Sequence, residues 1–111
     1  MTVAELAKAL ELTPAAGAEG MGREVTGGYC GDLLSWVMGR AQEGDAWITV
    51  MGNLNAVAVA VLADTACIIL AEGVGLDEGT LKQAESEGIA VLTTELPVFD
   101  MALEVYEAGL S

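Results

Sequence analysis

Hydrophobic residues in the C-terminal two thirds of the chain gather in short runs separated by longer segments. The runs Ala46–Met51, Ala66–Leu70 and Ile89–Thr93 are mainly apolar and show no strict alternation with polar residues. Runs of this kind are typical of strands that are buried on both faces of a sheet. A helix-length segment separates each run from the next, which predicts βαβ units and three mutually parallel strands.

Helical spacing of apolar residues predicts the connecting elements. The segments Ala56–Ala63, Leu76–Glu87 and Leu96–Ala108 fit helices, and Pro97 is tolerated in the first turn of the last one. The inner face of that last helix is predicted to carry Val98, Met101, Ala102 and Val105.

The chain begins with a helix signal. Thr2 and Glu5 have the spacing of a capping box, which predicts a first helix that ends near Leu10. We expect a short extended piece at Leu12-Thr13 and a loop over Ala15–Gly22, which is rich in glycine.

The next segment contains an unusual group of glycines. Glu24–Tyr29 is expected to be extended but interrupted by a turn at Gly27-Gly28. Asp32 is then expected to cap a helix that ends near Gly44. One face of this helix is predicted to carry Leu33, Leu34, Val37, Met38 and Ala41.

These patterns together predict an α/β fold. Residues 1–111 are expected to form a single small domain with a mainly parallel sheet, built from βαβ units and flanked by helices. Of the 111 residues, 53% are hydrophobic and 19% charged, which is typical of a folded chain. A chain of this length buries roughly 65% of its unfolded surface, enough for one core.

Acidic residues dominate the charge. The chain has 17 acidic and 4 basic residues and a net charge of −13, and its cations are Lys8, Arg23, Arg40 and Lys82. Such a field repels nucleic-acid phosphates and anionic lipid surfaces, so we expect neither nucleic acid nor a membrane as partner. A basic partner protein or a metal-chelated nucleotide remains compatible with this charge.

No targeting signal is expected to direct the chain out of the cytoplasm. The longest apolar run, Ala56–Ala63, is far shorter than the roughly 20 residues that a membrane helix needs. The first residues lack a basic segment followed by an apolar core, and Glu5 comes early. We therefore expect a cytoplasmic protein.

The sequence lacks the usual catalytic patterns. It has no histidine, and Cys30 and Cys67 stand far apart, which predicts buried reduced thiols and no metal site. No P-loop is present, and no G-x-G-x-x-G follows a predicted strand. We therefore expect no catalytic residues, no cofactor and no enzymatic activity.

Candidate ligand-binding residues follow the predicted strands. In open parallel sheets, ligands bind beyond the carboxyl ends of the strands. Here those positions fall at Gly52-Asn53-Leu54-Asn55, Ala71-Glu72-Gly73 and Thr93-Thr94-Glu95, and the candidate binding residues among them are Asn53, Asn55 and Thr94. The alternative is that each side chain only starts the next helix.

A second candidate is the turn expected at Thr26-Gly27-Gly28. Its glycines allow the backbone to approach a ligand, and a helix N-terminus is predicted to follow, so the turn could bind a phosphate. Arg23 would supply the countercharge. The alternative is a sharp turn between a strand and a helix.

The segment Arg23-Glu24-Val25-Thr26-Gly27-Gly28 resembles the DRTGG domain, which is named for an Asp-Arg-Thr-Gly-Gly run. Gly22 stands in place of the aspartate, and Glu24-Val25 separate Arg23 from Thr26. The resemblance extends over nearly the whole chain, through Gly31–Gly39, Gly44–Thr49 and Asn55–Ala60.

The resemblance implies a regulatory module. Domains of this family accompany long phosphotransacetylases and the CBS domains of some pyrophosphatases, and they look like the N-terminal domain of HPr kinase/phosphorylase. It implies a non-catalytic domain that senses a nucleotide or another phosphate-bearing metabolite, with or without Mg²⁺, and acts as a homodimer. The alternative is a protein-interaction scaffold without a small ligand, linked to iron hydrogenase or redox metabolism.

The two tryptophans have different predicted places. Trp47 lies in a buried strand and is expected in the core, whereas Trp36 lies off the apolar stripe of its helix. The Trp36 surface is therefore the first expected dimer contact, and partial burial against the sheet is its alternative.

Overall fold

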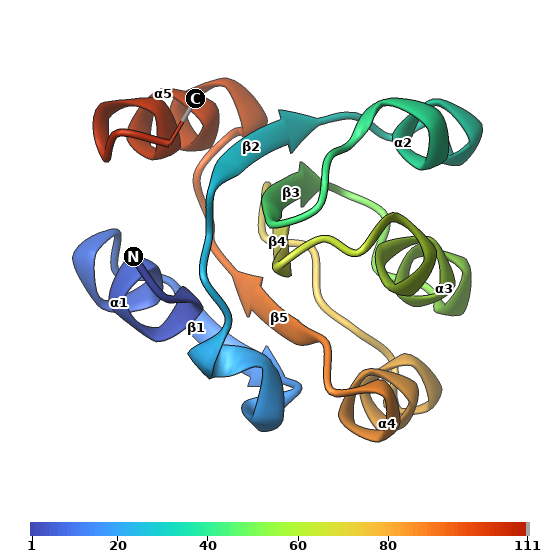
Figure 1. The fold of residues 1–111 in the computed structure, drawn as a ribbon. Helices are drawn as coiled ribbons and strands as arrows, with labels where there is room; N and C mark the ends of the chain where they lie inside the picture. Colours follow the sequence, from blue (N-terminus) through green and yellow to red (C-terminus); the bar gives the residue numbers. More distant parts are fainter. Residues whose placement is uncertain (111) are drawn as a thin grey trace.

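One five-stranded sheet organises the chain, with helices on both of its faces. The computed structural model describes residues 1–110. The strand order is β1-β5-β4-β3-β2. Figure 1 shows α2, α3 and α4 on one face of the sheet and α1 and α5 on the other.

The strands are β1 (Thr13–Ala16), β2 (Gly27–Cys30), β3 (Asp45–Thr49), β4 (Cys67–Leu70) and β5 (Ala90–Thr93). The helices are α1 (Val3–Ala9), α2 (Leu34–Arg40), α3 (Leu54–Ala63), α4 (Glu78–Glu87) and α5 (Val98–Glu107), with a 3₁₀ turn η1 (Ala18–Gly22) after β1.

The predicted parallel strands are confirmed. β3 pairs in parallel with β4, and β4 with β5, so each pair is joined through a helix as expected. β2 adds a fourth parallel strand beside β3. β1 pairs antiparallel with β5, with Thr13 opposite Thr93, so the sheet is mainly parallel.

The core lies in two layers, one on each face of the sheet. Trp47 is fully buried under α2, α3 and α4, as predicted, and its Nε1 donates to the carbonyl oxygen of Gly31 at 2.9 Å. Its neighbour Ile48 points to the other face, where it packs with Met101 and Val105 of α5. This alternation makes the strands apolar on both faces, which is why their sequence runs are apolar throughout.

Helix caps confirm part of the N-terminal prediction and correct another part. Thr2 and Glu5 form the predicted capping box of α1. Asp32, in contrast, does not cap α2, whose N-cap is Leu33. The Asp32 carboxylate instead accepts hydrogen bonds from Thr49 Oγ1 at 2.7 Å and from the N–H of Val50 at 3.0 Å, so it ties the ends of β2 and β3 together.

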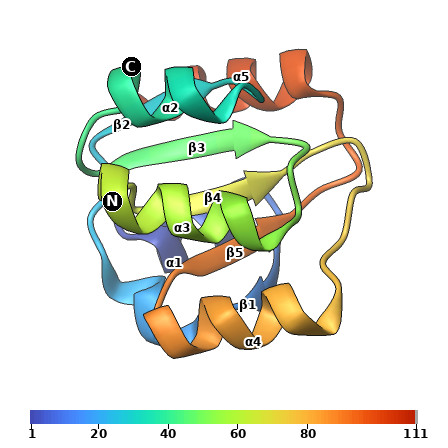
Figure 2. The same cartoon turned by 90° about the vertical axis from the view of Figure 1, so that its right-hand side faces the viewer.

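The predicted face of α2 is only partly buried. Val37 is fully buried, whereas Leu33 and Met38 are exposed. The helix lies at the edge of its layer, beside α3 alone (Figure 2), so fewer of its positions find a neighbour.

Three local predictions near the glycines are wrong. Gly27 and Gly28 do not interrupt the extended segment, because they begin β2 and pair with Asp45 and Ala46. Ala15–Gly22 is not a plain loop, because its start belongs to β1 and its end to η1. Cys30 is exposed, and only Cys67 is buried.

The remaining helices are confirmed with shifted ends. α3 begins earlier than expected because Asn53 caps it, and α4 begins later because Asp77 caps it. α5 begins after Pro97, and its inner face is as predicted, with Met101 and Val105 buried. Within residues 1–110, no helix has the length and apolar character needed to cross a membrane.

Candidate functional site

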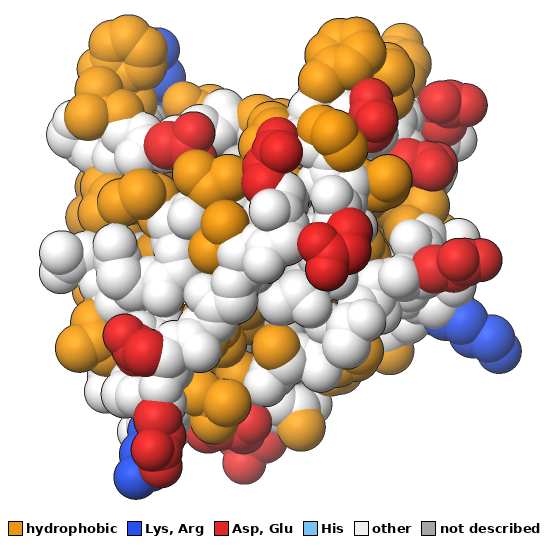
Figure 3. Space-filling view, turned by 180° about the vertical axis from the view of Figure 1, so that it is seen from behind, with side chains coloured by type: hydrophobic (Ala, Val, Ile, Leu, Met, Phe, Trp, Pro, Cys, Tyr) orange, Lys and Arg blue, Asp and Glu red, His pale blue; other side chains and the backbone are white. Residues whose placement is uncertain are grey.

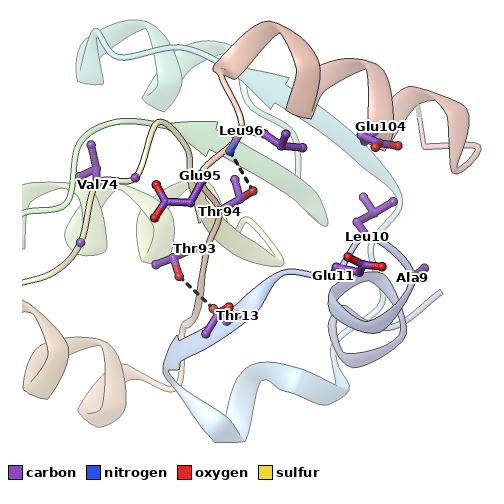
Figure 4. Close-up of a pocket in the computed structure, with 12 residues that line it drawn as sticks. Ala9, Leu10, Glu11, Thr13, Val74, Thr93, Thr94, Glu95, Leu96 and Glu104 are labelled. Atoms are coloured by element: carbon purple, nitrogen blue, oxygen red, sulfur yellow. Dashed lines mark hydrogen bonds between the residues drawn. The ribbon is translucent and has the colours of Figure 1, made fainter.

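A pocket of about 660 Å³ opens at the carboxyl edge of the sheet. Four segments line it: the end of α1 with the start of β1, the loop from β4 to α4, the loop from β5 to α5, and α5 itself through Glu104 (Figure 4). The lining residues are Ala9, Leu10, Glu11, Thr13, Gly73, Val74, Gly75, Thr93, Thr94, Glu95, Leu96 and Glu104.

The antiparallel edge strand creates one side of this pocket. Because β1 runs opposite to β5, the first residue of β1 lies beside the last residue of β5. Thr93 Oγ1 donates to the carbonyl oxygen of Thr13 at 3.3 Å, which joins the two ends. The pocket therefore combines the carboxyl end of a parallel strand, where ligands usually bind, with a wall from the first residues of the chain.

Backbone hydrogen bonds hold the two loops against each other. The N–H of Thr94 donates to Leu70 O at 2.9 Å, and the N–H of Gly73 donates to Thr94 O at 3.0 Å. Glu72 links the loop to α5, because its carboxylate accepts from the N–H of Val98 at 2.8 Å. Pro97, the N-cap of α5, makes no side-chain cap hydrogen bond, and Glu72 fills that role.

The β4–α4 loop has an uncommon backbone at the pocket wall. Glu72 and Gly73 both lie in the left-handed region, with φ of 62° and 75°. The positive φ of Gly73 favours glycine there, because L side chains are strained in this region. A non-glycine residue in this region, such as Glu72, stores backbone strain, and strained residues gather at functional sites.

Charge in the pocket is negative. Glu11, Glu95 and Glu104 line it, and none of its lining residues is basic. Figure 3, which views the carboxyl edge, shows acidic and apolar side chains over this surface and basic side chains only at its margins. Within residues 1–110, no three Asp, Glu or Cys side chains are grouped closely enough to hold a metal ion. A bare anion is therefore disfavoured, and a ligand accompanied by a cation fits better.

The pocket also offers neutral hydrogen-bonding groups. Hydroxyl groups come from Thr13, Thr93 and Thr94. Among the described residues, no hydrogen bond uses the N–H of Gly75 or of Glu95. Unpaired N–H groups and hydroxyls at the end of a strand are the groups that hold phosphate oxygens in α/β folds.

Of the predicted binding residues, Thr94 alone lies in this pocket. Its Oγ1 accepts from the N–H of Leu96 at 3.2 Å, so it also shapes the loop. Asn53 caps α3 by accepting from the N–H of Ala56 at 3.1 Å, which is the alternative role foreseen for it. Asn55 is exposed in the first turn of α3 and lines a different groove, between α3 and α4.

Arg23, Thr26, Gly27 and Gly28 lie at the opposite, amino edge of the sheet. The Arg23 guanidinium donates to Thr65 O at 2.9 Å and to Asp64 O at 3.3 Å, and it forms an ion pair with Asp64 at 3.0 Å. Thr26 Oγ1 donates to Glu43 O at 3.3 Å. Ligand binding by this group stays a prediction.

The anion-site prediction combines the glycines with the N-terminus of the following helix, and the two lie apart in the structure. β2 lies between Gly27 and the start of α2, so the helix N-terminus is at the other edge of the sheet. A strand of this length spans about 13 Å. The glycines and the helix N-terminus therefore cannot form one compact anion site.

Two of the pocket walls could be predicted from the sequence, because Gly73 and Thr93-Thr94-Glu95 follow buried apolar runs. The wall formed by α1 and β1 could not. Glu11 could not be found, because it reaches the pocket only through the pairing of β1 with β5, distant in sequence. The sequence signal that identifies the other walls is a polar residue directly after a buried apolar run.

Neither cysteine is an activated nucleophile. Cys30 is exposed, but partial desolvation of its sulfur raises the pKa of the thiol, and the nearby Asp32 carboxylate adds to that rise. Burial raises the pKa of Cys67 to about 12. Both thiols are therefore protonated near neutral pH and react slowly.

Comparisons with known proteins bear on the fold. No protein-family model and no curated protein sequence matches the chain. Among solved structures, the chain is similar to a crystal structure of the CBS and DRTGG domains of the regulatory region of Clostridium perfringens pyrophosphatase, complexed with the activator diadenosine tetraphosphate. The TM-score is 0.72 at 15% sequence identity, and the match covers 94% of this chain and 45% of the other. The likeness shows a shared fold.

Proposed function

We propose that this chain is a DRTGG-like regulatory module without catalytic activity. It binds a nucleotide or another phosphate-bearing metabolite and acts as a homodimer on a metabolic partner. The fold shared with part of a pyrophosphatase regulatory region supports this proposal. That region was solved with a nucleotide activator, which makes nucleotides the first ligands to test on this chain.

The pocket at the carboxyl edge is the observation that carries the proposal. Its volume, about 660 Å³, is in the range of small-ligand sites, roughly 300–1,000 Å³. Its threonine hydroxyls and the N–H groups of Gly75 and Glu95 suit phosphate oxygens, whereas its glutamates oppose their charge. We therefore propose that the phosphate enters together with Mg²⁺, which offsets that repulsion.

The Thr26-Gly27-Gly28 segment with Arg23 is the competing location for the phosphate. Gly28 is exposed at the start of β2, so its backbone is accessible. Arg23 is already engaged by Asp64 and Thr65, which weakens this location as an anion site.

A thermal-shift panel tests the proposal. It contains adenine and guanine nucleotides, diadenosine tetraphosphate, acetyl phosphate and nicotinamide cofactors, each with and without Mg²⁺. A ligand at 100 times its Kd adds about 2.7 kcal/mol of stability, which raises the Tm of a domain of this size by roughly ten degrees. We expect a nucleotide to produce this shift, and more strongly with Mg²⁺. If no ligand moves the Tm, the ligand-binding proposal fails.

Three glycine substitutions locate the site. A Cβ at Gly75 meets no atom within 4 Å, so Gly75→Leu adds a side chain at the pocket wall without a clash and should abolish the ligand shift. Gly22→Leu is the matched control, because Gly22 is equally open and lies in η1, away from the pocket. Gly28→Val tests the competing location, and its Tm without ligand shows whether valine disturbs α5, because a Cβ at this position lies 3.2 Å from Val105 Cγ1. Loss of the shift in Gly28→Val, with Gly75→Leu unaffected, would move the site to the amino edge.

A scaffold that binds a partner protein without a small ligand is the second candidate function. Large apolar side chains that are mostly exposed favour it, among them Leu62, Phe99 and Tyr106. Such side chains are typical of interaction surfaces when they gather in patches. The scaffold function would be supported if no ligand of the thermal-shift panel raised the Tm and if a partner protein bound the wild type but not variants of these side chains.

A further inference from the structure

The outward face of α3 is apolar, although it faces solvent. The helix contains no charged residue, and its exposed positions are Leu54, Asn55, Ala58, Val61 and Leu62, of which only Asn55 is polar. Leu62 is 71% exposed. We call Leu54, Ala58, Val61 and Leu62 the α3 face.

Its neighbour α4 shows what a solvent-facing helix in this position normally looks like. α4 has the same length and covers the same side of the sheet. Its exposed side chains are polar or charged, namely Glu78, Lys82, Gln83, Glu85, Ser86 and Glu87. A helix that is apolar all round is normally covered on all sides. The α3 face is therefore suited to contact another molecule.

A groove runs beside this face. It has a volume of about 440 Å³ and is lined by Val57 and Ala58 of α3 and by Gln83 and Glu87 of α4, among others. Figure 2 shows α3 in the middle of its layer, between α2 and α4, with its outer side toward the viewer. A partner helix laid on α3 can therefore place side chains into a recess.

We propose that a second copy of this chain docks here, with the two α3 helices antiparallel about a two-fold axis at Ala58. The proposal rests on the homodimer of the proposed function and places its interface. Leu54 and Leu62 each lie four residues from Ala58, so this arrangement brings Leu54 opposite the second copy's Leu62, and the reverse. Each leucine lies about 6 Å from the axis along the helix. The small side chain of Ala58 allows the two helices to approach to about 8–10 Å.

Charge also favours α3 over the other exposed apolar surfaces. On α5, the exposed Phe99, Leu103 and Tyr106 alternate with the exposed carboxylates of Asp100, Glu104 and Glu107, so pairing two copies there brings like charges together. On α2, the Arg40 guanidinium lies over the Trp36 ring at 3.9 Å and covers one of its sides. The α3 face has no charge to repel a second copy of a chain that carries −13.

Sedimentation equilibrium with charge-exchange variants tests this interface. The wild type should have twice the monomer mass of 11.4 kDa at micromolar concentration. Leu62→Glu should weaken the dimer about thirtyfold or more, because a carboxylate then faces an apolar side chain. The double variant Leu54→Lys, Leu62→Glu should restore most of the affinity, because each lysine faces a glutamate of the second copy. Within one chain these positions are eight residues apart, about 12 Å, too far to pair. Phe99→Glu, on α5, is the matched control and should leave the dimer unchanged.

A cross-link keeps the proposal testable if a variant folds poorly. In a Cys30→Ser background, Ala58→Cys should form a covalent dimer on mild oxidation, whereas Phe99→Cys should not. A monomeric wild type at 100 µM, a dimer that Phe99→Glu disrupts and Leu62→Glu does not, or no cross-link at position 58 would each overturn the proposal. The ligand shift should persist in Leu62→Glu, because the pocket is lined by residues of other elements. A wild type that binds the ligand as a monomer therefore overturns this interface and leaves ligand binding intact.

Discussion

Replacement of Arg23 by alanine separates a structural role of this arginine from a role in ligand binding. Its guanidinium joins the segment before β2 to the end of α3, through the carbonyl oxygens of Asp64 and Thr65 and the carboxylate of Asp64. We expect Arg23→Ala to destabilise the fold and to leave the ligand-induced thermal shift unchanged. A ligand countercharge would behave in the opposite way.

The contacts give the size of the effect. The hydrogen bond to Thr65 O, at 2.9 Å and partly buried, has a charged donor and contributes about 2 kcal/mol. The longer bond to Asp64 O and the half-exposed ion pair together add about 1 kcal/mol, because solvent screens both. The free energy of unfolding should therefore fall by about 3 kcal/mol. At ~4 °C per kcal/mol, the Tm falls by roughly 12 °C.

Urea unfolding of four proteins measures these terms. They are the wild type, Arg23→Ala, Asp64→Asn and the double variant. Asp64 has a positive φ of 59°, which asparagine also tolerates, so Asp64→Asn removes the charge and keeps the backbone. The coupling free energy between the two sites should be about 0.5–1 kcal/mol and should shrink at high salt. Lys82→Ala, which breaks an exposed pair with Glu78, is the control and should cost about 0.3–0.5 kcal/mol.

Two results would refute this reasoning. A loss of less than about 0.5 kcal/mol in Arg23→Ala would mean that its contacts do not stabilise the fold. Normal stability combined with loss of the ligand shift would identify Arg23 as part of a binding site at the amino edge.

Further predictions concern a glycine, the thiols and two helix caps. Gly17→Ala should destabilise the fold severely, because the φ of Gly17 is 74° and a Cβ there would collide with Ile89 O. Gly22→Ala is the control and should leave the stability almost unchanged, because a Cβ at Gly22 meets no atom within 4 Å. Urea unfolding compares the two variants. Ellman's reagent should label one thiol, Cys30, in the native protein and both cysteines in denaturant, since Cys67 is buried. The Cys30 reaction should accelerate as pH rises, because partial desolvation and Asp32 raise the pKa of this thiol and thiolate is scarce near neutrality. Cys30→Ser should remove the reaction of the native protein. Hydrogen bonds from Thr80 lower the pKa of Asp77, and those from Thr2 lower the pKa of Glu5. Both carboxylates therefore stabilise the fold above their ordinary pKa values, 3.8 for Asp77 and 4.5 for Glu5. This stabilisation is lost as pH falls below those values. The destabilisation by Asp77→Ala should accordingly be full at pH 7 and shrink toward pH 2 in thermal melts.

The buried centre of the fold could be predicted from the sequence because its composition leaves little choice. β3 and β4 are buried at every position, and a helix-length segment separates each from the next strand. Alternate side chains of these strands are buried under two layers of helices, one on each face of the sheet. Such burial on both faces is typical of a parallel sheet. These elements depend on local pattern alone, so the pattern was sufficient.

The edge strands could not be predicted in the same way. β1 contains Pro14 and β2 begins with two glycines, and neither sequence favours a strand. Each becomes extended by pairing with β5 or β3. At Gly28, a Cβ would lie 3.2 Å from Val105 Cγ1, so this glycine permits close packing of α5 and is not a turn residue.

The candidate site was predictable only where its walls follow β4 and β5. Thr94 was identified because it follows β5, and the same rule selected Asn53, whose side chain is used as a helix cap. The rest of the pocket depends on where β1 and α5 pack. Such contacts arise from tertiary structure and leave no local signal.

The most direct test of the proposed function is the location of the bound ligand. We would titrate ¹⁵N-labelled protein with the strongest nucleotide of the thermal-shift panel and Mg²⁺, and follow each backbone amide by NMR. We expect the amide signals of Gly73, Gly75 and Glu95, on the pocket walls, to move most, and those of Gly27 and Gly28 to stay in place. Shifts centred on Gly27 and Gly28, with Gly75 and Glu95 unmoved, would contradict it.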